Sequence, residues 1–124
     1  MTTQNCSDEK IIIITRGEKA VFDIYVKTLG RPFDLTNFNQ FKLGLEKEDG
    51  STLTITHTAN VNGSQIAKVS HDVLGHLQVT LGSVDTALLK VAFGQDMDLE
   101  LNHSTPNPKR RRLHKSLNVE NSLL

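Results

Sequence analysis

Aromatic rings and cysteine are scarce in this sequence. It has no tryptophan, one tyrosine, five phenylalanines and a single cysteine, Cys6. One cysteine cannot form a disulfide within the chain or supply a cysteine-based zinc site, although it can join two chains. The shortage of tryptophan and tyrosine argues against a carbohydrate-binding adhesion module, because such modules stack exposed aromatic rings on sugars. Carbohydrate binding is kept only as an alternative.

An excess of charge of one sign is also missing, because 14 acidic residues balance 14 lysines and arginines. Proteins that coat nucleic acid or a membrane surface need a basic excess over much of their surface. The longest apolar run is the four isoleucines at 11–14, which is far too short to cross a bilayer. The N-terminus has no basic region followed by an apolar run, so it does not resemble a secretory signal. We expect no membrane partner.

Motifs that carry catalysis or bind cofactors are absent as well. No serine lies in a GxSxG elbow, and no glycines form a GxGxxG or GxxxxGK phosphate loop. The histidines are not spaced as metal ligands; they are His57, His71, His76, His103 and His114. Asp96, Asp98 and Glu100 have a calcium-like spacing, but a strand holds alternate carboxylates about 7 Å apart and has no loop to wrap an ion. We expect a non-enzymatic protein with no catalytic residue, cofactor or metal.

Two-residue periodicity is the main signal that is present. Phe41, Leu43 and Leu45 alternate with polar residues, which is typical of a strand with one buried face. The Asp49-Gly50 pair then predicts a tight hairpin, with the chain returning over residues 52–57. Similar patterns predict strands at 11–14, 20–27, 65–70, 76–81, 95–102 and 109–119, with a loop at 28–39 and a second turn at 60–64.

A short helical turn is expected between the strands at 76–81 and 95–102, with Val84, Leu88 and Leu89 on its buried face. The isoleucine strand should be buried on both faces or lie between two subunits, because an exposed edge this apolar would aggregate. Seven or eight short strands with almost no helical periodicity favour an all-β, two-sheet sandwich. We therefore predict one domain at 10–119, a flexible N-terminal segment at 1–9 and a tail at 120–124.

The basic run at 109–112 has two interpretations. A nucleic-acid-binding regulator could use it to contact phosphates. The strand before it carries three acidic residues on one face, so a hairpin between the two strands would neutralise the run through cross-strand ion pairs worth about 0.2–1 kcal/mol each. No aromatic residue is interleaved for base stacking. We predict ion pairing, with nucleic-acid binding as the alternative. The predicted ion-pair residues are Asp96, Asp98, Glu100, Arg110, Arg112 and His114.

Three longer stretches carry a resemblance. They are ITRGEKAVFDIYV, GRPFDLTNFNQFKLGLEKEDGS and DTALLKVAFGQDMDLEL, and the ending RRRLHKSLNVE follows them. Together they resemble the immunoglobulin-like domain at the N-terminus of phage baseplate upper proteins and of related small phage virion proteins. The matching motifs are Arg16-Gly17, Asp34-Leu35-Thr36, Asp49-Gly50, and Thr86 with Leu89 and Gly94. The resemblance spans residues 10–120 and implies an immunoglobulin-like sandwich.

The resemblance also implies a function. It implies a virion structural protein without catalysis, attached to the tail or baseplate or to the capsid surface. Its partners would be other virion proteins, with the chain present as a homo-oligomer or a lattice-bound subunit. Its location would be the phage particle, assembled in the bacterial host cytoplasm. The expected subunit contacts are Ile11, Ile12, Ile13, Ile14, Phe33, Phe38, Leu117, Val119, Leu123 and Leu124.

Overall fold

The computed structural model describes residues 12–69, 75–103 and 110–121, and the side chains of all of these except 103 and 110–116. Short strands dominate, with one helical turn, α1, at Ser83–Thr86. The strands are β1 Ile12–Thr15, β2 Ala20–Tyr25, β3 Lys27–Thr28, β4 Arg31–Pro32, β5 Phe38–Glu46, β6 Thr52–Thr56, β7 Gln65–Lys68, β8 His76–Leu81, β9 Ala92–His103 and β10 Arg110–Glu120.

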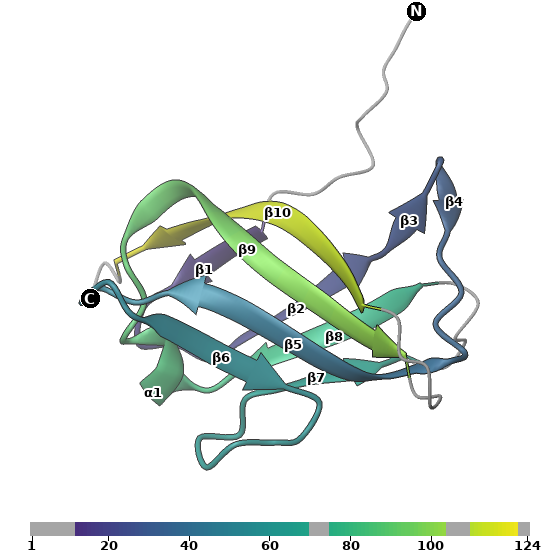
Figure 1. The fold of residues 1–124 in the computed structure, drawn as a ribbon. Helices are drawn as coiled ribbons and strands as arrows, with labels where there is room; N and C mark the ends of the chain where they lie inside the picture. The colour runs from purple at the N-terminus through teal and green to yellow at the C-terminus, as the bar shows by residue number, and fades with distance from the viewer. Residues whose placement is uncertain (1–11, 70–74, 104–109, 122–124) are drawn as a thin grey trace, which may run out of the picture.

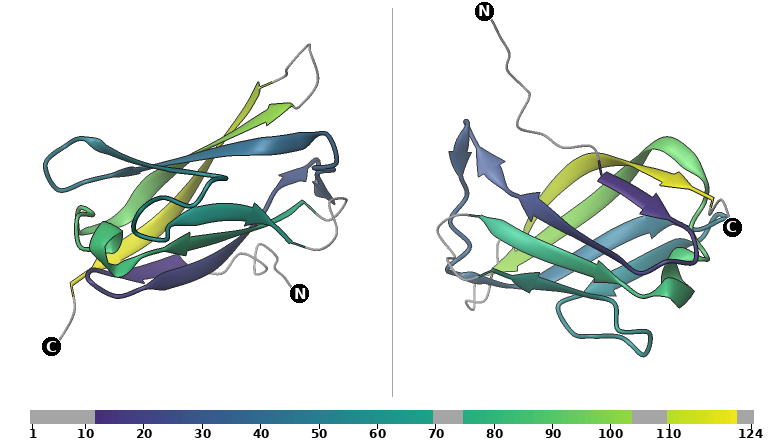
Figure 2. Two further views of the ribbon diagram at one scale, coloured as in Figure 1. Left: turned by 90° about the horizontal axis from the view of Figure 1, so that it is seen from below. Right: turned by 180° about the vertical axis from the view of Figure 1, so that it is seen from behind.

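The strands form two facing sheets (Figures 1 and 2). One sheet has the order β1-β10-β9-β5-β6, and the other has the order β2-β8-β7, with β3 and β4 pairing separately. All pairs are antiparallel except β1 with β10, which is parallel. The first sheet matches strands G, F, C and C′ of an immunoglobulin variable-type domain, and the second matches B, E and D. The predicted immunoglobulin-like two-sheet sandwich is confirmed.

The core is built from the alternating residues that face the other sheet. The predicted inward residues Leu43 and Leu45 on β5, and Ile55 on β6, are almost fully buried. The whole of β8 follows the predicted alternation, with Leu77 and Val79 buried. Antibody domains add an inter-sheet disulfide and a core tryptophan, and this chain has neither pair of cysteines nor tryptophan. Aliphatic burial, worth about 1.5–3 kcal/mol for each large side chain, takes their place.

The predicted Asp49-Gly50 hairpin is present. Glu46 pairs with Thr52, and the Lys47 N–H donates to the Ser51 carbonyl at 2.8 Å. Gly50 has a φ of 89°, which the turn requires and which glycine adopts without a steric penalty. The second predicted turn also forms, because the Asn60 N–H donates to the Ser64 carbonyl at 3.0 Å. Both turns place loops at the same end of the sandwich as α1 (Figure 1).

The isoleucine strand differs from expectation. β1 lies at the edge of the larger sheet and pairs only with β10 among the described residues. Ile14 is fully buried and Ile12 partly so, whereas Ile13 is 57% exposed. The first alternative, burial of both faces within this chain, was wrong, because a strand of a two-layer sandwich packs only one face on the opposite sheet. The second alternative, a position between two subunits, stays a prediction. Ile11 lies outside the described residues.

The predicted loop at 28–39 contains a small hairpin instead of irregular chain alone. β3 pairs with β4 across Leu29 and Gly30, whose φ angles are 53° and 78°. Two consecutive positive φ angles are the geometry of a two-residue hairpin turn. The Asp34-Leu35-Thr36 segment after it forms a turn, because the Thr36 N–H donates to the Asp34 side chain at 2.9 Å.

The helical turn is confirmed, but its predicted face was wrong. Leu89 is buried as expected, whereas Val84 and Leu88 are 58% and 44% exposed. Asp85 and Thr86 are buried in their place. Hydrogen bonds from neighbouring loops satisfy both polar side chains, which removes the cost of burying them.

Candidate protein-binding site at the α1 end of the sandwich

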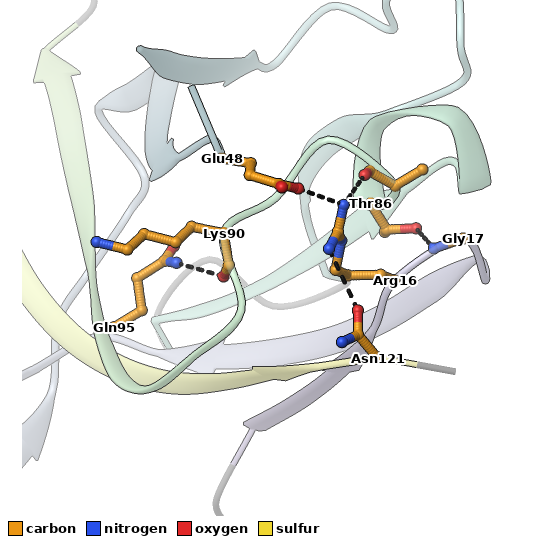
Figure 3. Close-up of polar contacts among 8 residues, drawn as sticks. Arg16, Gly17, Glu48, Thr86, Lys90, Gln95 and Asn121 are labelled. Carbon is orange, nitrogen blue, oxygen red and sulfur yellow. Dashed lines mark hydrogen bonds and ion pairs between the residues drawn. The ribbon is translucent and has the colours of Figure 1, made fainter. Parts of the chain in front are cut away.

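Four loops meet at one end of the sandwich, which we call the α1 end (Figure 1). It comprises α1 and the segment that follows it to Gly94, the turn after β1, the β5–β6 hairpin and the loop at 60–64. The last described residue, Asn121, also lies there (Figure 3). Backbone hydrogen bonds join these pieces, since the Glu48 N–H donates to the Leu88 carbonyl at 2.9 Å and the Lys90 N–H donates to the Glu46 carbonyl at 3.1 Å.

The Arg16 side chain joins three of these segments (Figure 3). Its Nη2 lies 2.6 Å from Oε2 of Glu48 and donates to the Ala87 carbonyl at 2.9 Å. Its Nη1 donates to Oδ1 of Asn121 at 3.2 Å. A planar guanidinium presents several N–H groups in fixed directions, so one arginine can tie several loops together. The arrangement accounts for the Arg16-Gly17 motif without assigning it a catalytic role.

Thr86 makes the next connection. Its hydroxyl accepts a hydrogen bond from the Gly17 N–H at 3.0 Å and lies 2.9 Å from the Glu18 carbonyl, to which it can donate. Both partners belong to the turn between β1 and β2, which crosses from one sheet to the other. The buried hydroxyl therefore anchors that crossing to α1.

Asp85 is the most buried charged group of the α1 end, with 3% of the residue exposed. Its Oδ1 accepts from Nδ2 of Asn62 at 2.8 Å, and its Oδ2 accepts from Nδ2 of Asn60 at 2.9 Å and from the Ser64 hydroxyl at 2.5 Å. Burial alone would raise the pKa of Asp85, but the hydrogen bonds from Asn60, Ser64 and Asn62 outweigh it and hold the pKa below its ordinary value. A carboxylate in this position is a structural anchor for the loop at 60–64.

Exposed apolar side chains are concentrated at this end. Nine large apolar residues are exposed among those described, and five of them lie here: Val61, Val84, Leu88, Val91 and Phe93. Phe93 is 80% exposed because β9 bulges beside it: Leu117 pairs with Gln95 and Val119 pairs with Ala92, which leaves Phe93 and Gly94 unpaired. Gly94 takes a φ of 75°, and its N–H donates to the Asn118 side chain at 2.9 Å. Bulges commonly turn a side chain out of its strand's alternation in this way.

Two open, shallow hollows flank the Arg16 guanidinium. Gly17, Ala87 and Asn121 line the first with Arg16. The second is lined by Arg16, Lys47, Glu48, Asp49, Ala87 and Leu88. Neither encloses a small molecule as a ligand pocket normally does, whereas a shallow surface with apolar side chains suits a protein partner.

A second polar cluster lies on the outer face of the smaller sheet. The Tyr25 and His76 rings are stacked, with centroids 4.3 Å apart, and Nε2 of His76 lies 2.8 Å from Oδ1 of Asp23. The register explains both contacts, since Tyr25 pairs with His76 and Asp23 pairs with Gln78. One face of the single tyrosine ring is therefore covered by a neighbouring side chain.

The structure separates the predicted subunit contacts into three groups. Ile14, Phe38, Leu117 and Val119 lie in the core of this chain, with at most 8% exposed, so the prediction that they contact other subunits was wrong. Their alternation places them between the two sheets. Ile12 and Phe33 are partly buried against the same core, and Ile13 is exposed. Ile11, Leu123 and Leu124 lie outside the described residues.

The predicted ion-pair ladder depends on the register of β9 and β10. Arg112 pairs with Glu100 and His114 with Asp98, whereas Arg110 faces Asn102 and Asp96 faces Ser116. The hairpin thus brings the acidic strand beside the basic one. Because the side chains at 110–116 are not described, the ion pairs themselves stay a prediction.

Sequence reasoning missed the exposed residues of the α1 end. It placed Val84 and Leu88 on a buried face and gave Phe93 no role. The Gly94 that follows Phe93 is the one local signal for a bulge, because an isolated glycine inside a strand pattern often marks one. The hydrogen-bonding partners of Asp85 lie 21 to 25 positions away in the sequence, so no local pattern indicates them.

The described ranges hold neither a metal-binding group nor a membrane-spanning helix. In 12–69, 75–103 and 110–121, no three His, Cys, Asp or Glu residues are grouped closely enough to hold a metal ion. The same part of the chain includes no helix with the length and apolar character needed to span a bilayer.

No protein-family model matches this chain, and neither does any curated protein. Among solved structures, the chain is similar to murine CRIg, with 15% sequence identity over 92% of this chain and 93% of that one and a TM-score of 0.45. The strand order and pairing, rather than this distant likeness, carry the assignment of the immunoglobulin-like sandwich.

Proposed function

We propose that this chain is a non-enzymatic structural protein of a bacteriophage virion, an immunoglobulin-like assembly module attached to the tail or baseplate or to the capsid surface. The α1 end is its surface for binding another virion protein. The binding surface is inferred from the exposure of Leu88, Val91 and Phe93, which lie on one continuous segment. The virion assignment is supported by the resemblance in the sequence.

Two features suit the α1 end to binding. Exposed apolar side chains at a well-ordered surface commonly mark protein contacts. The loops that carry them are tied by Arg16, Thr86 and Asp85, so little conformational freedom is lost when a partner binds. Glu48 partly neutralises Arg16, which lowers the cost of burying the guanidinium against a partner.

Mass spectrometry of purified particles tests the virion assignment. Particles of the phage that encodes the chain should contain it at a fixed copy number after density-gradient purification. Particles made without the chain should bind the added purified chain and sediment with it. If the chain is absent from purified particles and does not sediment with them, it is not a virion protein.

Surface variants test the α1 end separately. Phe93→Ser and Leu88→Ser should each weaken binding to particles by about tenfold or more, since central apolar contacts carry much of the binding energy. Leu29→Ser is the matched control, because Leu29 is 97% exposed but lies on the β3–β4 hairpin. Binding by Phe93→Ser and Leu88→Ser at the wild-type level would exclude the α1 end while leaving the virion assignment intact.

Light scattering over a dilution series distinguishes a second copy from a different partner. A monomer that binds particles through the α1 end agrees with the proposal. A stable oligomer that dissociates in the Phe93→Ser variant would mean that the α1 end joins copies of this chain instead.

A further inference from the structure

The loop at 60–64 contains the pair Asn62-Gly63, which is chemically reactive in a flexible chain. The backbone nitrogen of the residue after an asparagine can attack the side-chain amide carbon, and a glycine in that position offers no side chain to hinder the attack. Asparagine is for this reason among the residues that limit the durability of proteins. The hydrogen bonds around Asn62 and Gly63 show how the fold affects this reaction.

The fold engages both reacting groups in hydrogen bonds to other residues. The attacking nitrogen, of Gly63, donates its hydrogen to the Asn60 carbonyl at 3.0 Å. The leaving group, Nδ2 of Asn62, donates to Oδ1 of Asp85 at 2.8 Å. The N–H of Asn62 itself donates to Oδ1 of Asn60 at 2.8 Å. Attack would require the loop to give up these hydrogen bonds first.

The loop is also packed tightly against the chain beneath it. A Cβ placed on Gly82 would lie 2.1 Å from the Asn62 carbonyl oxygen, so only glycine allows the loop to lie this close. The Gly82 N–H donates to the Ser64 hydroxyl at 2.9 Å, and that hydroxyl donates in turn to Asp85. Opening the loop therefore breaks a connected set of contacts in one event.

We propose that Asn62 is a deamidation site that the folded α1 end protects, and that its deamidation is irreversible. When the loop opens, the Gly63 nitrogen loses its proton and bonds to Cγ of Asn62, while the Cγ–Nδ2 bond breaks and Nδ2 leaves as ammonia. The product is a five-membered succinimide. Water then opens the ring at either carbonyl, giving aspartate or isoaspartate at position 62.

The product cannot return to the closed arrangement. An aspartate at 62 places a carboxylate where an amide now donates to Asp85 at 2.8 Å, and two carboxylates cannot both stay ionised that close together. An isoaspartate also lengthens the backbone by one bond. The loop then stays detached, and the α1 end loses one of its ties.

Peptide mapping by mass spectrometry measures the reaction directly, using the whole chain at mildly alkaline pH. Deamidation at 62 should be slower in the folded chain than in urea by about tenfold or more, since the rate depends on the population of the open loop. Gly82→Ala should raise the rate in the folded state, because its Cβ displaces the loop. Gly44→Ala is the matched control, since its Cβ meets only ordinary contacts of 3.4 Å or more. Equal rates in the folded wild type and in urea would overturn the protection.

A charge swap tests the consequence without depending on the Gly82 variant. Asn62→Asp mimics the product and should lower the melting temperature by about 5 °C or more. The double variant Asn62→Asp with Asp85→Asn should recover most of that loss, because an amide at 85 can donate to a carboxylate at 62 while still accepting from Asn60 and Ser64. An unchanged melting temperature for Asn62→Asp, or no recovery in the double variant, would show that the product does not act through Asp85.

Discussion

Arg16 and Asn121 stand 105 positions apart in the sequence, and the Arg16 side chain donates a hydrogen bond of 3.2 Å to the Asn121 side chain. The Arg16 N–H also donates to the Glu120 carbonyl at 2.9 Å. These contacts extend the parallel pairing of β1 with β10 beyond the last ladder pair, Thr15 with Glu120. Hydrogen bonds therefore join the first and last described strands at the α1 end.

Replacing Arg16 should destabilise the fold through lost hydrogen bonds more than through lost charge. Its ion pair with Glu48 is exposed on the glutamate side and is worth little alone. Arg16→Ala should lower the free energy of unfolding by about 1–3 kcal/mol. Arg16→Lys keeps the charge but cannot reach Ala87 and Asn121 together, so it should recover less than half of the loss. Urea unfolding measures both, and full recovery by lysine would assign the effect to charge.

Asp85 should make the protein sensitive to acid. Its pKa is lowered in the folded state, so its carboxylate stabilises the fold above the ordinary aspartate pKa of about 4. That stability should disappear as the pH falls from about 5 through the lowered pKa, because the protonated side chain accepts hydrogen bonds weakly. Asp34 and Asp49 also have lowered pKa values and act in the same direction.

Asp85→Asn isolates this contribution to the pH dependence. The variant should be less stable at neutral pH by about 2–4 kcal/mol, since its amide faces that of Asn62. Its free energy of unfolding should also fall less steeply below pH 5. Thermal unfolding across that pH range checks both statements, and parallel curves for the variant and the wild type would contradict the role given to Asp85.

Gly75 should tolerate no side chain. It has a φ of 64°, and a Cβ would lie 2.4 Å from the Val26 carbonyl oxygen. Gly75→Ala should lower the free energy of unfolding by about 2 kcal/mol or more, through left-handed strain and the clash. Gly44→Ala, in the middle of β5, should cost less than about 1 kcal/mol because its Cβ makes only ordinary contacts, the nearest with the Thr52 side chain at 3.4 Å. Similar losses for both variants would rule out the clash as the cause.

The pairing of Arg112 with Glu100 makes the predicted ion-pair ladder testable. Glu100 is 9% exposed on the outer face of the sheet, where β10 and β5 flank it. A double-mutant cycle with Arg112→Ala and Glu100→Gln should give a coupling energy of about 0.2–1 kcal/mol, which high salt reduces. The pair Arg110 and Asn102, in which the residue opposite the arginine is not acidic, is the control cycle. A coupling energy of zero for both pairs would exclude the predicted ion-pair ladder.

The strand pattern could be read from local residues because a strand repeats every two positions. Phe41, Leu43 and Leu45 are buried as that period predicts, and so are Leu77, Val79 and Leu81. The Asp49-Gly50 turn was predictable for an equally local reason, since it needs a residue with positive φ. Where the period breaks, prediction failed. Phe38 and Phe41 are both buried although three positions apart, because the register shifts between Phe38 and Gln40.

The candidate site was the part that sequence reasoning did not reach. Helical periodicity assigned Val84 and Leu88 to the core, since apolar side chains are usually buried. In the fold, Asp85 and Thr86 take the buried positions because Asn60, Asn62, Ser64 and Gly17 supply hydrogen bonds from distant loops. Composition also did not indicate that β1 would lie at the edge of its sheet, with Ile14 buried and Ile13 57% exposed.

The sequence by itself determined the class of fold, because alternation and turn residues act over a few positions and leave two sheets as the way to bury one face of each strand. Only the tertiary structure decided which apolar side chains are exposed at the surface. That choice depends on which distant loops satisfy a buried carboxylate such as Asp85, and on where a bulge such as the one at Gly94 turns Phe93 outward. These contacts join residues far apart in the chain, and local propensity contains no information about them.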